Sequence, residues 1–91
     1  MNEFTREVLI SNKLGLHARA ATKLAQLTQK FDAQVTVKLG DKEADASSIM
    51  GLMLLAGGKG KVVTVITKGQ EAEQALTQVC QLFTDKFEED E

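Results

Sequence analysis

The sequence predicts an α+β domain of two layers, an open-faced β-sandwich in which a four-stranded antiparallel sheet, ordered 1-4-2-3, carries three helices on one face. The first observation is that stretches with the period of strands and stretches with the period of helices follow each other in the order β-α-β-β-α-β-α. The second is that a right-handed crossover from the first strand to the second leaves a gap that the fourth strand can fill. The 91 residues are expected to form one domain, residues 1–91, with a single core.

The first two elements are a strand and a long helix. β-branched and apolar residues predict the strand at 5–10. The helix is predicted at 18–30, and its lysines, Lys23 and Lys30, are expected to face solvent or a partner. Its buried stripe follows spacings of three and four and comprises Ala20, Ala21, Leu24, Leu27, Thr28 and Phe31.

A hairpin and a short helix come next. Alternation of apolar and polar residues at 34–39 predicts a strand with one buried face. The turn signal at 40–42 returns the chain as a short polar edge strand at 43–46. The apolar run at 49–55 predicts a short helix, capped by the serines at 47 and 48 and ended by the glycines at 57 and 58.

The last strand and helix complete the core. Residues 61–68 predict a central, buried strand, because Val62, Val63, Val65 and Ile66 follow closely on one another, and Gly69 ends it. The third helix begins in the acidic stretch 70–73, where negative charge suits the helix dipole. Its buried stripe is predicted as Ala72, Ala75, Leu76, Val79, Cys80, Phe83 and Phe87, so Cys80 is interpreted as a packed core thiol. Residues 88–91 are expected to be a solvated acidic tail.

Composition narrows the function classes. The formal net charge of −2, the pI of about 5.4 and the lack of Trp and Tyr argue against a nucleic-acid-binding surface. The start of the chain lacks the features of a signal peptide, and the longest apolar run, at 49–56, is too short to span a membrane. The single cysteine agrees with a reducing compartment, so a cytoplasmic protein is expected. No metal-binding cluster or cofactor motif stands out, and nothing demands a dimer, so a cofactor-free monomer is expected.

The only histidine, His17, lies where the first strand gives way to the first helix. Histidine is a poor N-cap residue, and a broken local rule is often a sign of function. A helix start presents free backbone N–H groups, here those of Ala18 and Arg19, and the Arg19 guanidinium can clamp an oxyanion. Together these groups predict a phosphohistidine site with His17 as nucleophile. The alternative from local pattern alone is an ordinary surface histidine.

The segment Gly15-Leu16-His17-Ala18-Arg19 resembles the active-site segment of the HPr family, the histidine phosphocarriers of the bacterial phosphotransferase system. The resemblance implies the HPr fold and a phosphoryl group accepted on Nδ1 of His17 from Enzyme I, a phosphoenolpyruvate-dependent kinase. It also implies transfer onward to an Enzyme IIA, with Arg19 as the anion partner, which is a relay more than a turnover enzyme. The family usually has proline where this chain has Ala20, and alanine keeps a backbone N–H that proline lacks.

A second segment, residues 46–53, is similar to the HPr segment whose serine is phosphorylated in some bacteria by a regulatory HPr kinase. Ser48 aligns with that serine, although a serine before an apolar helix is explained equally well as an N-cap. The run at 49–55 holds more apolar side chains than one buried face can take, so some are expected to form a docking surface. The predicted partner surface comprises Leu16, Ala18, Ile49, Met50 and Met53, and the alternative is that the apolar residues of 49–55 are all core.

Residues 12–15, Asn-Lys-Leu-Gly, and the acidic tail resemble the nitrogen-related branch of the family, called NPr. That resemblance implies an Enzyme I and an Enzyme IIA of the nitrogen type as partners. The sugar branch stays open as an alternative. A non-catalytic HPr-like regulator that binds through residues 49–53 is the alternative from another class.

Overall fold

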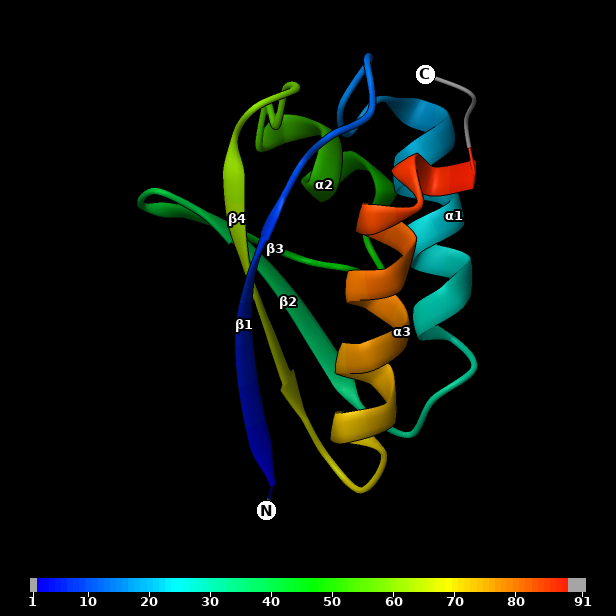
Figure 1. The fold of residues 1–91 in the computed structure, drawn as a ribbon. Helices are drawn as coiled ribbons and strands as arrows, with labels where there is room; N and C mark the ends of the chain where they lie inside the picture. Colours follow the sequence, from blue (N-terminus) through cyan, green and yellow to red (C-terminus); the bar gives the residue numbers. More distant parts are fainter. Residues whose placement is uncertain (1, 89–91) are drawn as a thin grey trace.

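The protein is described by a computed structural model that places residues 2–88. Its elements, in chain order, are β1 (Glu3–Leu9), α1 (Ala18–Thr28), β2 (Gln34–Leu39), β3 (Lys42–Asp45), α2 (Ile49–Leu54), β4 (Val62–Lys68), α3 (Ala72–Thr84) and the 3₁₀ turn η1 (Lys86–Glu88). The strands form one antiparallel sheet in the order β1-β4-β2-β3, and the three helices lie on one side of it (Figure 1). The predicted fold class and strand order are confirmed, with element ends shifted by one or two residues at β1, α1, β3, α2 and β4. Of the predicted acidic tail, residues 89–91 lie outside the described residues.

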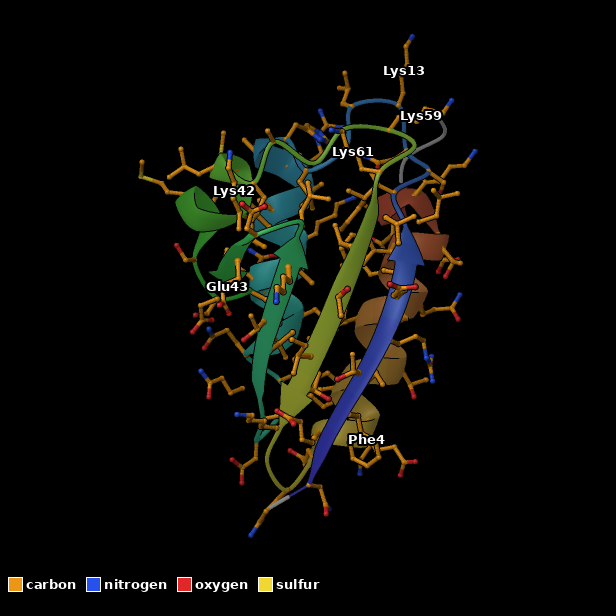
Figure 2. The ribbon with its side chains drawn as sticks, turned by 90° about the vertical axis from the view of Figure 1, so that its left-hand side faces the viewer. Phe4, Lys13, Lys42, Glu43, Lys59 and Lys61 are labelled. Carbon is orange, nitrogen blue, oxygen red and sulfur yellow. The ribbon has the colours of Figure 1, made fainter. Side chains whose placement is uncertain are left out.

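β4 occupies the centre of the sheet, between β1 and β2. The prediction that it is buried holds for one face only, because Val63 and Val65 are fully buried whereas Val62 is 50% exposed and Ile66 is half-buried. The reason is that all three helices pack against the same face of the sheet, which leaves the other face to solvent (Figure 2).

The core fills the space between the sheet and the helices. Cys80 belongs to it, as predicted, and its residues also include Leu24 of α1, Leu52 of α2 and Phe83 of α3. Burial raises the pKa of the Cys80 thiol, and the nearby Arg6 guanidinium of β1 opposes this shift.

The prediction for the end of the third helix is wrong in part. Phe87 is fully buried, but α3 ends at Thr84. The chain then turns through Lys86, Phe87 and Glu88, which have φ of 57°, 55° and 64°, in the left-handed region. This reversal places the Phe87 ring edge-on to Phe83, with 4.8 Å between ring centroids.

Lys23 secures this turn against α1. Its Nζ donates a hydrogen bond of 2.7 Å to the carbonyl oxygen of Phe87 and lies 3.6 Å from a carboxylate oxygen of Glu88. The expectation that Lys23 faces solvent or a partner is therefore wrong, because its ammonium group stabilises the C-terminal turn. Lys30 is exposed, as expected.

Candidate active site

His17 occupies the N-cap of α1, as the sequence predicts. Its backbone is extended (φ −75°, ψ 178°), and its carbonyl oxygen accepts the first hydrogen bond of the helix, 2.9 Å from the N–H of Ala21. The imidazole makes no capping hydrogen bond to α1. Ala20 and Ala21 are fully buried against the core and anchor this first turn. The helix start is thus held by packing while its N-terminal end keeps no side-chain cap.

Two loops cross beside His17 and fix the segment that carries it. The N–H of Leu16 donates to the carbonyl oxygen of Gly57 at 2.9 Å. Gly15 has φ of +62°, and a Cβ there would overlap the Gly57 carbonyl oxygen, so the backbones touch only because residue 15 lacks a side chain. The prediction that the glycines at 57 and 58 end the short helix is wrong: α2 ends at Leu54, and Ala56 adopts the left-handed conformation with φ of 56°.

The carbonyl oxygen of Gly15 orients the imidazole. Nδ1 of His17 lies 3.1 Å from this oxygen, and because a carbonyl can only accept, Nδ1 carries the proton in this conformation. Asn12, which is fully buried, donates to the same oxygen from Nδ2 at 2.8 Å. Nδ1 can accept a phosphoryl group only after the ring turns away from Gly15 and this proton leaves.

Asn12 was not predicted as a site residue. Its side chain closes the 12–15 loop onto the oxygen that also holds His17, so it positions the imidazole. The available signal is an asparagine three residues before a glycine, which is typical of turns that a side-chain amide closes. The partner it meets depends on the loop conformation, which the residue pattern does not specify.

The first three backbone N–H groups of α1 point out of the helix without acceptors. Among the described residues, neither a backbone nor a side-chain acceptor is found for the N–H of Ala18, Arg19 or Ala20. The Arg19 side chain is exposed and makes no ion pair within residues 2–88. A histidine, an arginine and three amides therefore converge on one helix end, a combination suited to a phosphoryl group.

An apolar hollow of about 270 Å³ adjoins the imidazole. It is lined by Leu14, Leu16, His17, Met53, Ala56, Gly57 and Gly58. Beyond it, α2 exposes Ile49 (38%), Met50 (73%), Met53 (44%) and Leu54 (72%), so these side chains are not all core. Leu14, 64% exposed, continues this apolar surface toward His17, and the prediction had left out both Leu14 and Leu54.

Two other predicted surface residues behave differently. Ala18 is exposed at the start of α1. Leu16 is only 5% exposed and belongs to the core with Ala21, so as a partner contact it is not supported. Its burial follows from its place directly before the N-cap, where an apolar side chain packs under the helix start.

Ser48 is the N-cap of α2. Its Oγ accepts a hydrogen bond of 3.0 Å from the N–H of Gly51, and the residue is exposed. Capping alone is a sufficient reason for a serine at this position.

Two further searches concern metals and membranes. Within residues 2–88, no three His, Cys, Asp or Glu side chains gather where they could hold a metal ion. In the same part of the chain, no helix combines the length and the apolar character needed to cross a bilayer.

Comparison with known proteins identifies the family. Residues 4–85 match a family model described as PTS HPr component phosphorylation site. The chain is 52% identical to phosphocarrier protein NPr of Shewanella violacea, over 98% of both chains, and 43% identical to phosphocarrier protein HPr of Xylella fastidiosa, over 92% of this chain and 94% of the relative. The crystal structure of an HPr from Thermoanaerobacter tengcongensis superposes with a TM-score of 0.89 and 38% identity, covering both chains completely.

The fold, the uncapped helix start with His17 and the full-length similarity agree with one another. The chain belongs to the HPr family, the phosphocarriers of the phosphotransferase system.

Proposed function

We propose that this protein accepts a phosphoryl group on His17 from a phosphoenolpyruvate-dependent Enzyme I and passes it to an Enzyme IIA. The observation that carries this proposal is that His17 is an N-cap without a capping bond, beside N–H groups for which residues 2–88 provide no acceptor. Phosphoryl transfer needs in-line positioning and charge stabilisation more than covalent work by the protein, and the N–H groups of this helix start are suited to the charge stabilisation.

The direct test is intact mass after incubation with phosphoenolpyruvate, magnesium and Enzyme I. The expected result is the gain of one acid-labile phosphoryl group, which His17→Ala abolishes. If neither a nitrogen-type nor a sugar-type Enzyme I phosphorylates the protein, the carrier function fails, and a regulator that acts by binding alone becomes the better account.

We propose a cradle for the phosphoryl group at the helix start. A side-chain acceptor at an N-cap reaches the second and third N–H groups of a helix, here those of Arg19 and Ala20, so phosphoryl oxygens on His17 fall within their reach. Ala18 was predicted as a further donor, and the Arg19 guanidinium adds a charged one. Because Ala20 keeps its N–H, this helix start offers a donor that a proline would remove.

The cradle is tested by two proline variants. Ala20→Pro removes a hydrogen bond to a charged group, which is worth about 2 kcal/mol. The equilibrium constant for phosphorylation, measured from the phosphorylated fraction at a fixed ratio of phosphoenolpyruvate to pyruvate, should therefore fall by more than tenfold. Ala18→Pro is the comparison at the other alanine donor of this turn, and ψ of 178° at His17 is compatible with a following proline. An Ala20→Pro equilibrium equal to wild type would remove Ala20 from the cradle, and an Ala18→Pro equilibrium equal to wild type would remove Ala18.

We propose that Ile49, Met50 and Met53, with Leu54 and Leu14, dock the partners beside His17. Their exposure supports this, since exposed apolar side chains grouped beside a functional residue are typical of interaction surfaces. Met50→Glu should raise the KM for Enzyme I without lowering the melting temperature, because Met50 is 73% exposed. A lower melting temperature with an unchanged KM would assign Met50 to the fold instead.

We propose the nitrogen-related branch for this carrier, acting as a monomer in the cytoplasm. The identity to an NPr supports this branch, whereas the similarity to an HPr keeps the sugar branch as the second candidate. Exchange of phosphate with a nitrogen-type Enzyme I and IIA, compared at equal concentrations with the sugar-type pair, separates the two. Phosphorylation of Ser48 by an HPr kinase stays a prediction, tested by the loss of any modification in Ser48→Ala.

A further inference from the structure

A pair of half-exposed aliphatic side chains lies on the open face of the sheet, at the end where His17 lies. Leu9, the last residue of β1, and Val62, the first of β4, are cross-strand partners and are 51% and 50% exposed. At the opposite end of the same two strands, the cross-strand pair is the ion pair of Glu3 and Lys68, with 3.3 Å between nitrogen and oxygen. The end of the open face near His17 is thus apolar where the other end is charged.

Three lysines lie at the same end of the sheet as this apolar pair (Figure 2). Figure 2 shows Lys13, Lys59 and Lys61 at the same end of the sheet, and all three are exposed. Lys59 and Lys61 form no ion pair with any residue of 2–88. We call Leu9, Lys13, Lys59, Lys61 and Val62 the basic lobe.

The sequence explains why this end is basic in a chain of net charge −2. Residues 8–31 and 46–70 contain lysines and an arginine but no Asp or Glu. The fold brings the loops of these two stretches together, because the Ile10 N–H donates to the Lys61 carbonyl oxygen and the Gly60 N–H donates to the Ile10 carbonyl oxygen, both at 2.8 Å. Glu7, two residues before Leu9 on the same face of β1, is the first carboxylate met along that strand.

The basic lobe is continuous with the phosphoryl-transfer site. Gly57 and Gly58, which line the hollow beside His17, run directly into Lys59. Leu14 lines the same hollow and directly follows Lys13. The basic lobe therefore starts where the hollow ends, on the side away from α2. A protein that binds over His17 and is wider than the hollow also contacts the basic lobe.

We infer that the basic lobe is a second docking surface for the phosphotransferase partner, and that it receives a patch of carboxylates with an apolar centre beside the partner's own phosphoryl-carrying residue. This inference rests on the proposed function and extends its interface from α2 to the open face of the sheet. Complementary charge at the rim of an interface accelerates the encounter and fixes orientation, and the apolar pair supplies area from which water is excluded. Lys59 and Lys61, which have no ion pair within residues 2–88, suit an acidic protein face, and the small number of cations and the net negative charge do not suit a nucleic acid.

The test is the initial rate of phosphoryl transfer as a function of carrier concentration, from Enzyme I to the carrier and from the phosphorylated carrier to Enzyme IIA. The double variant Lys59→Glu/Lys61→Glu should raise the KM for at least one partner about tenfold at low salt, with kcat unchanged, and the difference should shrink at high salt. The matched control is Lys30→Glu/Lys68→Glu, which changes the net charge equally at exposed positions away from the lobe, since Lys68 lies at the opposite end of β4. Its KM should stay within about threefold of wild type.

The apolar pair has its own variant. Leu9→Thr/Val62→Thr keeps β-forming residues and removes apolar area, so KM should rise about fivefold with little dependence on salt. Melting temperatures show that each variant is folded.

Equal KM values for the lobe and control variants, with both partners, would overturn the inference. A vesicle of anionic lipid or another acidic protein that binds the lobe while both KM values stay at wild type would overturn it as well. These outcomes differ from failure of the proposed function, in which wild-type protein gains no phosphoryl group from any Enzyme I.

Discussion

Gly15→Ala tests how the active-site loop is held. The residue has φ of +62°, so an alanine there costs about 1 kcal/mol from its left-handed backbone alone. The new Cβ would also overlap the carbonyl oxygen of Gly57, and forcing two backbone segments apart costs about 2 kcal/mol more. The free energy of unfolding should therefore fall by about 3 kcal/mol.

Gly40→Ala is the matched control. Gly40 also has φ of +62°, but a Cβ there meets nothing within 4 Å, so only the backbone cost of about 1 kcal/mol remains. Urea unfolding of both variants should show a difference of about 2 kcal/mol, equivalent to roughly 10 °C in melting temperature. Because the Gly15 carbonyl oxygen holds Nδ1 of His17, phosphorylation should slow in Gly15→Ala and stay near wild type in Gly40→Ala. Equal destabilisation of the two variants would refute the contact between the loops as the reason for glycine at position 15.

Three more predictions concern stability. Phe87→Ala should lower the free energy of unfolding by about 3 kcal/mol, because the ring is fully buried against Phe83. Phe4→Ala, at a half-buried position, should lower it less. The reverse order of the two losses in urea titrations would contradict this packing. Ser48→Ala should lose the side-chain cap of α2 and lower the free energy of unfolding by about 1 kcal/mol, whereas Ser48→Asp should retain most of that stability. Thermal unfolding measures both variants. Equal losses of stability in the two variants would mean that the cap contributes nothing. Because burial raises the pKa of Cys80, the unfolded chain loses its thiol proton first, so stability should decline above about pH 8.5 more in wild type than in Cys80→Ser. Parallel curves of unfolding free energy against pH for these two proteins would contradict the shift.

The residue pattern predicted the four strands and the three α-helices, most directly where an amphipathic stripe has one face to bury. It failed at the C-terminal end of α3. Phe87 continues the four-residue spacing from Phe83, yet the chain leaves the helix between them. Neither glycine nor proline marks the break, and the reversal depends on a distant contact, the hydrogen bond from Lys23 to the Phe87 carbonyl oxygen. A pattern of residues records which side chains are buried more reliably than the path by which the backbone buries them.

The candidate site divides in the same way. The position of His17 and Arg19 at a helix start was predictable, because a helix start presents backbone N–H groups whatever the rest of the fold does, and their roles in phosphoryl transfer stay a prediction. The roles of Asn12 and Gly57 were not predictable. Asn12 bonds to Gly15 within a loop whose conformation the residue pattern does not specify, and Gly57 acts across a contact between two loops that are far apart in the sequence. Leu16 was placed on the surface for a related reason, since nearness to His17 along the chain says nothing about which side chain turns inward.

The missing side-chain hydrogen bond at the N-cap of α1 connects stability to function in this molecule. Replacing a capping side chain by one that makes no cap costs about 1 kcal/mol, and His17 accepts that cost at the start of α1. Burial of Ala20, Ala21 and Leu24 compensates, because the first two turns are held by the core and the helix forms without a cap. A conventional cap would occupy the N–H groups that a phosphoryl group on His17 would use in the proposed cradle. The packing beneath the helix start therefore lets the helix form although residues 2–88 offer these N–H groups no acceptor.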